Sequence, residues 1–246
     1  MATPQRILVI GAGGGIGSAV TRLIAAAGGS VYLAGRDAGK LAPLAAELGL
    51  PHGTLDATDP DAVDSCADAA AAALGGLDGI VNCAGSLLLK PAHLTTTAEW
   101  QATLAANLTS GFGCVRAAGR LLRANGGSVV LVSSAAARVG IANHEAIAAA
   151  KAGVIGLVLS AAATYAKQRI RFNAVAPGLV RTPLTKGLVS SEPAEKASIG
   201  MHPLGRLGEP GDVARAIVFL LDPAQDWITG QVLGVDGGLA DLKSRP

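Results

Sequence analysis

Aromatic side chains are scarce in this sequence of 246 residues, where Phe, Trp and Tyr together make up 3%. Only two tyrosines occur, Tyr32 and Tyr165, so few phenols are present for any proton-transfer chemistry. Aliphatic residues take their place, because half of the chain is hydrophobic. That content can form one sizeable core, and a length of 246 residues favours one large α/β domain over two small ones.

Charged residues are also few, and their signs are balanced. Twenty Lys and Arg stand against eighteen Asp and Glu, which leaves a net charge of only +2. No cluster of basic residues forms a stripe that could follow a phosphate backbone. We therefore expect no nucleic acid partner.

Cysteine is rare and irregularly spaced. Cys66, Cys83 and Cys114 lack the spacing of metal ligands, and their odd number does not indicate a disulfide framework. We expect no metal site. Free thiols fit the reducing cytoplasm, which is the location that we predict.

Segments that would target the chain or cross a membrane are not apparent. The first residues, MATPQR, run into a short apolar strand without the core of a signal peptide. The longest uncharged and largely apolar stretch, 152–166, is bounded by Lys151 and Lys167 and is too short for a membrane span. We predict that it is a helix buried between neighbouring elements.

Short β-branched runs alternate with alanine-rich stretches along the chain. The predicted strands lie at 7–10, 31–34, 79–82, 128–133, 171–175 and 230–236. Such alternation predicts βαβ units, and the continuous apolar character of the strands indicates burial on both faces. The fold class is therefore α/β: one domain over 1–246 of the Rossmann type, a doubly wound parallel sheet with helices on both faces.

One segment, 183–203, breaks this alternation. It mixes Pro, Gly, Ser and charged residues between a strand and the next helix. We predict a mobile lid over a substrate, the alternative being an ordinary surface loop.

A glycine-rich loop, GAGGGIG, follows the first predicted strand directly and precedes a helix. Glycines at Gly11, Gly15 and Gly17 permit a tight turn and bring backbone N–H groups at the helix N-terminus close to a pyrophosphate. The placement between a strand and a helix predicts a dinucleotide site.

The end of the second strand indicates which dinucleotide binds. In such folds a carboxylate about 20 residues after the loop accepts from the ribose 2′-OH of NAD, but here Gly35 and Arg36 stand at that place. A guanidinium can pair with a 2′-phosphate, so NADP is predicted and NAD is less favoured. The alternative is that Arg36 is a solvated loop residue and Asp37 reads the ribose.

These and later motifs together resemble the short-chain dehydrogenase/reductase family over nearly the whole chain. The motifs are GAGGGIG (11–17), LDAT with Asp56, NCAG (82–85), ANLTSGF with Asn107, VSSA with Ser134, Lys151, PGLVRT (177–182) and ITGQVLGVDGG (228–238). With Arg36, the resemblance implies a set of cofactor-binding residues, namely Gly11, Gly15, Ile16, Gly17, Arg36, Asp56, Asn82, Ala84, Gly85, Lys151, Pro177, Gly178 and Thr182. It also implies a homo-oligomer, expected to be a tetramer.

The sequence departs from the family at the proton donor. The family motif is Tyr-x-x-x-Lys with its tyrosine thirteen residues after the serine, and that position is Ile147. Tyr165 lies fourteen residues beyond Lys151, and Tyr32 lies in the second strand. We therefore interpret the chain as a variant that lacks this tyrosine.

Three catalytic residues of the family have counterparts. By resemblance, Ser134 polarises a substrate oxygen, Asn107 holds a water in a proton path, and Lys151 holds the nicotinamide ribose. Each has a structural alternative. The Ser134 hydroxyl could only satisfy backbone groups, and Asn107 could only mark a helix kink or turn. Lys151 could extend its amine to the surface.

His144 is the candidate replacement for the missing donor. It lies seven residues before Lys151, hence on the same helical face, and this is the Tyr-to-Lys spacing of the family's enoyl reductases. With Asn143 as the expected N-cap, its imidazole could accept a proton or donate a hydrogen bond. The alternative is a histidine that packs or contacts another subunit. Glu145 is expected only to interact with the helix dipole.

Two function classes follow. In the first, the protein is an NADP-dependent oxidoreductase for a small carbonyl, alcohol or conjugated alkene, with His144 or water in the proton path. In the second, it is a dinucleotide-binding regulator or scaffold without turnover. The retained Asn107, Ser134 and Lys151 favour the first, and the absent tyrosine favours the second.

Overall fold

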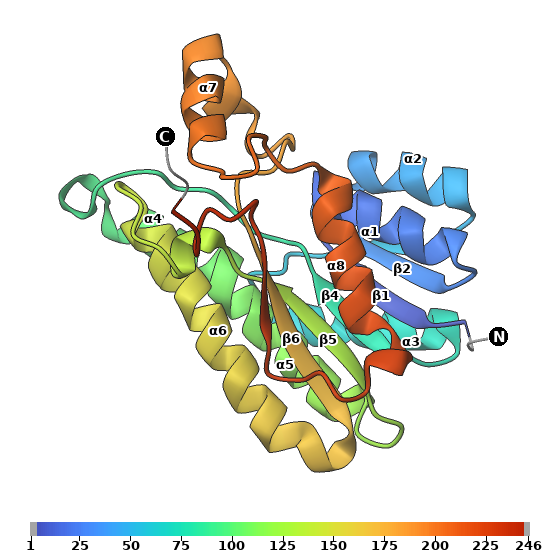
Figure 1. Ribbon diagram of the computed structural model, residues 1–246. Helices are drawn as coiled ribbons and strands as arrows, with labels where there is room; N and C mark the ends of the chain where they lie inside the picture. The colour runs from blue at the N-terminus through green and yellow to red at the C-terminus, as the bar shows by residue number, and fades with distance from the viewer. Residues whose placement is uncertain (1–3, 244–246) are drawn as a thin grey trace.

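One parallel sheet of seven strands forms the centre of the computed structural model, which describes residues 4–243 (Figure 1). The strand order is β3-β2-β1-β4-β5-β6-β7, and every neighbouring pair is parallel. The strands are β1 (Arg6–Ile10), β2 (Ser30–Gly35), β3 (His52–Thr54), β4 (Gly79–Asn82), β5 (Gly127–Val132), β6 (Ile170–Pro177) and β7 (Val232–Val235). The predicted fold class is confirmed, and residues 1–3 and 244–246 of the predicted domain lie outside the described chain.

The third strand was missing from the sequence prediction. β3 pairs with β2 at the edge of the sheet over only three residues, and two of them are exposed. Such a short, polar strand carries no apolar run by which it could be recognised. The other six strands lie within about three residues of their predicted bounds.

Helices cover both faces of the sheet, as predicted. They are α1 (Gly15–Ala26), α2 (Ala38–Leu48), α3 (Pro60–Leu74), α4 (Thr97–Leu104), α5 (Ser110–Leu121), α6 (Glu145–Tyr165), α7 (Glu192–Gly200) and α8 (Pro210–Leu221). Alternate strand residues feed two cores: Leu8 and Ile10 pack with α3, α5 and α6, whereas Ile7 and Val9 pack with α1, α2 and α8. The central strands β1, β4, β5 and β6 are thus buried on both sides, which explains their continuous apolar character.

Helix α6 is less buried than predicted. One face packs into the core beside β6 through Val154 and Val158, but the other is open, and Leu159 is 53% exposed. The helical run, Glu145–Gln168, is also longer than the uncharged stretch, and its length and composition would suffice to cross a membrane. A core helix passes the same test, and α6 has 44% of that window buried within the described chain.

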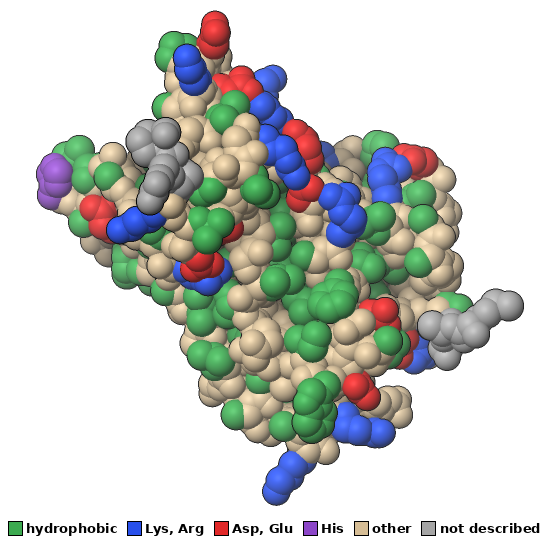
Figure 2. All heavy atoms as spheres, in the orientation of Figure 1, with side chains coloured by type: hydrophobic (Ala, Val, Ile, Leu, Met, Phe, Trp, Pro, Cys, Tyr) green, Lys and Arg blue, Asp and Glu red, His purple; other side chains and the backbone are tan. Residues whose placement is uncertain are grey.

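Large apolar side chains are also exposed on α5, α8 and β7 and on the segment after α8. Phe112 of α5 is 47% exposed, and Phe219 of α8 is 44% exposed. Trp227, which follows α8, is 97% exposed, and Leu233 of β7 is 40% exposed. Figure 2 shows hydrophobic side chains gathered over α8 and the chain that follows it. These faces are available for contacts with other chains.

The strand order reverses between β1 and β4, so the segments that follow these two strands diverge. In open α/β sheets this divergence creates a crevice at the carboxyl ends of the strands, where ligands bind. The predicted loop and catalytic motifs follow β1, β4, β5 and β6, so the fold brings them to this one edge.

The predicted lid segment, 183–203, holds a 3-10 helix (Lys186–Val189) and α7. Helix α7 stands away from the sheet in Figure 1. Its start follows ordinary capping rules, because the Ser191 hydroxyl accepts from the Ala194 N–H and acidic residues occupy the first turn.

Candidate active site

The glycine loop after β1 has the shape that a pyrophosphate needs. Gly11 has a φ of +80°, and a Cβ there would lie 2.6 Å from the Ala84 nitrogen. A Cβ on Gly17 would collide with the Gly11 carbonyl oxygen. Helix α1 begins at Gly15, and its N-cap, Gly14, has no side chain to bond the first N–H groups. These residues fit a bound phosphate anion.

A first cleft of about 400 Å³ extends from this loop to the ends of β2 and β3. Arg36, Asp37, Lys40 and Asp56 line its far end. Hydrogen bonds from the backbone and hydroxyl of Thr58, aided by the charge of Arg36, lower the pKa of Asp56. Lys40 was not predicted. It lies one turn into α2, and its ammonium is 3.5 Å from the Asp37 carboxylate.

Asn82 lies beneath the cleft rather than on its surface. Its side-chain oxygen accepts from the Ala84 N–H at 3.0 Å, and its amide donates to the Ser110 hydroxyl at 3.0 Å. The residue is 4% exposed and fixes the turn after β4, so that Cys83, Ala84 and Gly85 line the cleft. The structure therefore gives Asn82 a supporting position.

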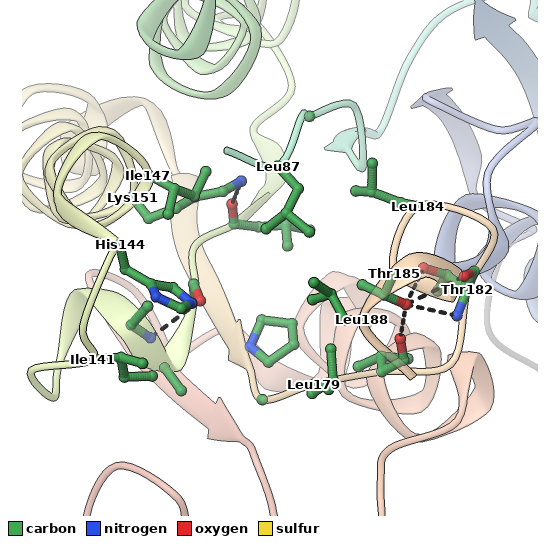
Figure 3. A pocket seen from close by; sticks show the side chains of 18 of the residues that line it. Leu87, Ile141, His144, Ile147, Lys151, Leu179, Thr182, Leu184, Thr185 and Leu188 are labelled. Atoms are coloured by element: carbon green, nitrogen blue, oxygen red, sulfur yellow. Dashed lines mark hydrogen bonds between the residues drawn. The ribbon is translucent and has the colours of Figure 1, made fainter. Parts of the chain in front are cut away.

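A second cavity, of about 390 Å³, adjoins the first at the ends of β5 and β6. Both are lined by Ile16, by Cys83, Ala84 and Gly85 after β4, and by Thr182 and Leu184 after β6. The two spaces therefore form one continuous cleft. The structure brings the predicted residues Asn107, Ser134, His144 and Lys151 together around the second cavity. Figure 3 shows His144 and Lys151 in this wall.

Lys151 lies at the base of this cavity. It is 7% exposed, and its ammonium donates to the Val132 carbonyl at 2.8 Å. Among the described residues, no carboxylate forms an ion pair with it. Burial lowers the pKa of Lys151 to about 8. The alternative of an amine that extends to the surface is excluded by this burial.

Two neighbouring serines after β5 have different positions. The Ser133 hydroxyl is buried and donates to the Lys151 carbonyl at 2.8 Å, which ties the strand end to α6. The Ser134 hydroxyl accepts from the Ala136 N–H at 3.1 Å and lines the cavity. A hydroxyl that accepts keeps its hydrogen, so Ser134 can still donate to a ligand oxygen.

Asn107 sits in a π-helical turn, Ala105–Thr109, between α4 and α5. Its amide nitrogen donates to the Thr103 carbonyl at 2.9 Å and to the Ser86 hydroxyl at 3.0 Å. Its oxygen accepts from the Ser86 N–H at 3.2 Å. Both amide hydrogens are thus used, and only the oxygen can accept further. The helix-kink alternative is therefore present in the structure, and it does not exclude the predicted site role, because π-turns often occur at functional sites.

The start of α6 differs from the prediction. Asn143 was expected as the N-cap, but it has a left-handed φ of 63°, and His144 is the N-cap residue. Asn tolerates the left-handed region better than other non-glycine residues, and the Asn143 carbonyl accepts from the Lys90 N–H at 2.8 Å. Glu145 is exposed in the first turn, as expected for a group that interacts with the helix dipole.

The His144 ring lines the cavity from the same face as Ile147 and Lys151 (Figure 3). Its Nδ1 lies 2.8 Å from the Ala142 carbonyl oxygen. A carbonyl oxygen can only accept, so Nδ1 carries the hydrogen. In the neutral ring Nε2 then has a free lone pair, which can accept a proton but cannot donate one.

Ile147 occupies the space one turn before Lys151. It is 4% exposed and lines the cavity. Neither tyrosine lines it. Tyr165 ends α6, and its ring centroid is 5.6 Å from that of Phe172, whereas Tyr32 lies in β2.

The segment after β6 crosses both halves of the cleft. Pro177 and Gly178 line the second cavity, and Thr182 lines both. The Thr182 hydroxyl is 3.0 Å from that of Thr185, and its methyl carbon would be 2.8 Å from a Cβ on Gly15. Thr182 therefore packs against the glycine loop.

His202 is a residue of the cavity wall that the sequence reading missed. It is 3% exposed. Its Nδ1 donates to the Ser198 carbonyl of α7 at 2.8 Å, and its Nε2 accepts from the Leu179 N–H at 3.1 Å. The ring thus joins α7 to the segment after β6. No spacing to another polar residue in the sequence points to this bridge.

Comparison with known proteins yields consistent matches. The family model described as enoyl-(acyl carrier protein) reductase matches residues 11–240. The chain is 41% identical to cis-4-hydroxycyclohexanecarboxylate dehydrogenase of Sinomonas cyclohexanicum, over 95% of this chain and 96% of the relative. It is 36% identical to a 3-oxoacyl-[acyl-carrier-protein] reductase of Thermotoga maritima, over 94% and 96%. A short-chain type dehydrogenase/reductase from Mycobacterium ulcerans superposes with a TM-score of 0.92 at 34% identity, covering 98% and 91%.

Proposed function

We propose, because this chain belongs to the short-chain dehydrogenase/reductase family, that it transfers hydride between NADP(H) and a small alcohol or carbonyl compound. A conjugated alkene is the alternative acceptor class, since the spacing of His144 and Lys151 resembles that of the family's enoyl reductases. The observation that carries the proposal is the single cleft, in which the glycine loop and the polar groups of α6 and β5 face one continuous space.

The phosphorylated cofactor is supported by two cations at the end of the first cleft. Arg36 follows Gly35 where a carboxylate would favour NAD, and Lys40, 3.5 Å from Asp37, lines the same cleft. Both could pair with a 2′-phosphate. The bound nicotinamide would supply the hydride acceptor, and Lys151 would hold its ribose.

Alcohol oxidation is the direction that the side chains support. As a hydrogen-bond donor to the Ala142 carbonyl, His144 keeps Nε2 free to accept the proton of a substrate hydroxyl. The Ser134 hydroxyl can donate to the same substrate oxygen and orient it. A positioned base of this kind contributes on the order of 10²- to 10⁴-fold in rate. Two relatives are named as dehydrogenases of hydroxyl compounds, namely cis-4-hydroxycyclohexanecarboxylate and D-threitol.

The test is NADPH formation over a panel of small secondary alcohols, with NADPH oxidation over the matching ketones and enones. Cofactor binding is measured in parallel by thermal shift. Turnover of any alcohol, abolished by exhaustive removal of NADP, supports the proposal. Tight cofactor binding without turnover on the whole panel contradicts it.

That negative result would instead favour a dinucleotide-binding regulator or scaffold. The observation behind this second candidate is Ile147, a buried apolar side chain where the family presents its phenol. The protein would then bind the dinucleotide without catalysing hydride transfer, and the cleft would serve as a sensor of the dinucleotide.

We also propose a cytoplasmic location. The three cysteines are free thiols, and burial raises the pKa of Cys66 and of Cys83, the latter to about 12. Thiols that stay protonated react slowly and need no oxidising compartment.

A further inference from the structure

The outer part of the second cavity is lined by aliphatic side chains from several segments. These include Leu87 and Leu89 after β4, Ile141 before α6, Leu179 and Leu188 after β6, and Met201 after α7. Figure 3 shows Leu87, Leu179 and Leu188 around the space that faces His144. A ligand that enters it loses water and gains apolar contacts.

The polar side chains of this wall are neutral, and most are already bonded. Both ring nitrogens of His202 are used by the chain itself. The Thr185 hydroxyl bonds the Val180 carbonyl and the Thr182 N–H. Ser134 and His144 keep a donor and an acceptor free, and these suffice for one hydroxyl or carbonyl oxygen.

Lys151 is the one cation among the residues that line this cavity, and its ammonium lies at the base, bonded to the Val132 carbonyl. A Cβ on Gly85, which lines both halves of the cleft, would lie 3.6 Å from the lysine nitrogen. A carboxylate at the outer end therefore meets no positive side chain in the described wall.

Three basic side chains near the cavity are paired with carboxylates of the same chain. Arg138 bonds the Asp241 carboxylate at 2.9 Å, and Arg181 pairs with Glu195. Lys90, on the segment after β4, is held by Glu99 at 2.9 Å. None of these three cations lines the cavity.

We propose, building on the oxidoreductase function above, that the substrate is a neutral, largely apolar secondary alcohol or its ketone and that the cavity rejects an anionic analogue. An ionised carboxylate moved into this wall would lose its hydration without gaining a counter-charge, whereas a methyl or ester group would not. The cavity volume of about 390 Å³ suits one ring with a short substituent.

A matched pair of compounds tests this directly. The methyl ester of 4-hydroxycyclohexanecarboxylate and the free acid share their ring and hydroxyl and differ in charge. At pH 7 we expect the ester to have a kcat/KM at least about 100-fold higher than the acid, with 4-methylcyclohexanol resembling the ester. Equal or better turnover of the acid would overturn the proposal.

Binding separates this inference from the proposed function. The same compounds are titrated calorimetrically into the full chain saturated with NADP. Preferred binding of the ester without turnover supports the neutral cavity and contradicts the oxidoreductase. Acid and ester that bind equally contradict the neutral cavity, whatever the turnover.

A charge introduced into the wall should reverse the preference. Leu188 lies in the 3-10 helix of the predicted lid and contributes no group to catalysis. Leu188→Arg should improve binding of the acid by on the order of tenfold, whereas the polar, uncharged control Leu188→Gln should not. A folded Leu188→Arg protein with an unchanged acid-to-ester ratio would count against charge as the cause.

Discussion

The ammonium of Lys151 lies 2.8 Å from the carbonyl oxygen of Val132, and this carbonyl is its one hydrogen-bond partner in the described chain. The amine is buried, so folding disfavours its charged form and lowers the pKa of Lys151 from 10.5 to about 8. Below pH 8 both the folded and the unfolded chain bind this proton, and the folded state bears the full cost of the buried charge. Between pH 8 and 10.5 only the unfolded chain binds it, so this residue makes stability rise with pH.

Lys151→Met should therefore stabilise the cofactor-free protein at neutral pH by on the order of 2 kcal/mol, after allowance for the lost hydrogen bond. The difference in the free energy of unfolding between Lys151→Met and the unmutated protein should shrink as pH rises from 8 to 10.5. Urea unfolding of both proteins across this range measures the difference. Parallel stability curves would mean that Lys151 is not buried as a charge.

Arg36→Ala should weaken NADPH binding by about tenfold or more and leave NADH nearly unchanged, because only the 2′-phosphate pairs with the guanidinium. Calorimetric titration with each cofactor measures both constants. Arg22→Ala is the matched control, since Arg22 pairs with Glu47 on the surface and does not line the cleft. Equal affinities for the two cofactors in the unmutated protein would contradict the NADP assignment.

His144→Ala should reduce turnover by roughly 10²-fold while NADPH affinity stays nearly intact, because the ring lines the substrate half of the cleft. His144→Gln separates the roles, since an amide can form hydrogen bonds but cannot take up the proton. His93, exposed in the 3-10 helix Ala92–Leu94, is the control histidine. If His144→Ala matches His93→Ala in turnover, water carries the proton instead.

Ile147→Tyr should restore or raise carbonyl reduction, because it places a phenol one turn from Lys151 in the same cavity. The larger ring can also clash in a wall shaped around isoleucine. Ile147→Phe is therefore the control, as it adds the ring without the hydroxyl. A folded, cofactor-binding Ile147→Tyr protein that reduces no ketone faster than Ile147→Phe would show that the site has been rebuilt around His144.

The chain should form a homo-oligomer, with a tetramer expected from the family. Exposed Phe112 and Leu159 on α5 and α6 give one contact face, and Phe219, Trp227 and Leu233 give another. Light scattering at micromolar concentration measures the mass. Phe112→Lys and Trp227→Lys change different contact faces, so each substitution alone should lower the measured mass of the oligomer. A monomeric mass for the unmutated protein would refute the prediction.

The sheet and the cleft could be predicted because their signals are local. A strand followed by GAGGGIG specifies a turn that only glycines can make, as the positive φ of Gly11 shows. His144, Ile147 and Lys151 share a face because helix periodicity fixes it. These features depend on residues that are neighbours in the chain.

The remainder of the site depends on distant segments or on competing local preferences. His202 meets Leu179 only after α7 has folded over the end of β6, and no periodicity encodes that contact. Lys40 reaches the cleft because α2 starts beside the glycine loop. Asn143 is favoured both as a helix N-cap and as a residue with a left-handed backbone, and local sequence does not decide between these roles. In the structure it has the left-handed backbone, and its carbonyl accepts a hydrogen bond from the Lys90 N–H.

The imidazole of His202 connects the wall of the substrate half of the cleft to the segment that reaches the dinucleotide half. Its two bonds fasten α7, over the substrate half of the cleft, to the chain that continues to Thr182 on the dinucleotide half. A swing of α7 that preserves both bonds displaces that chain as well. The position of α7 and the position of Thr182 are therefore expected to be coupled through this one side chain.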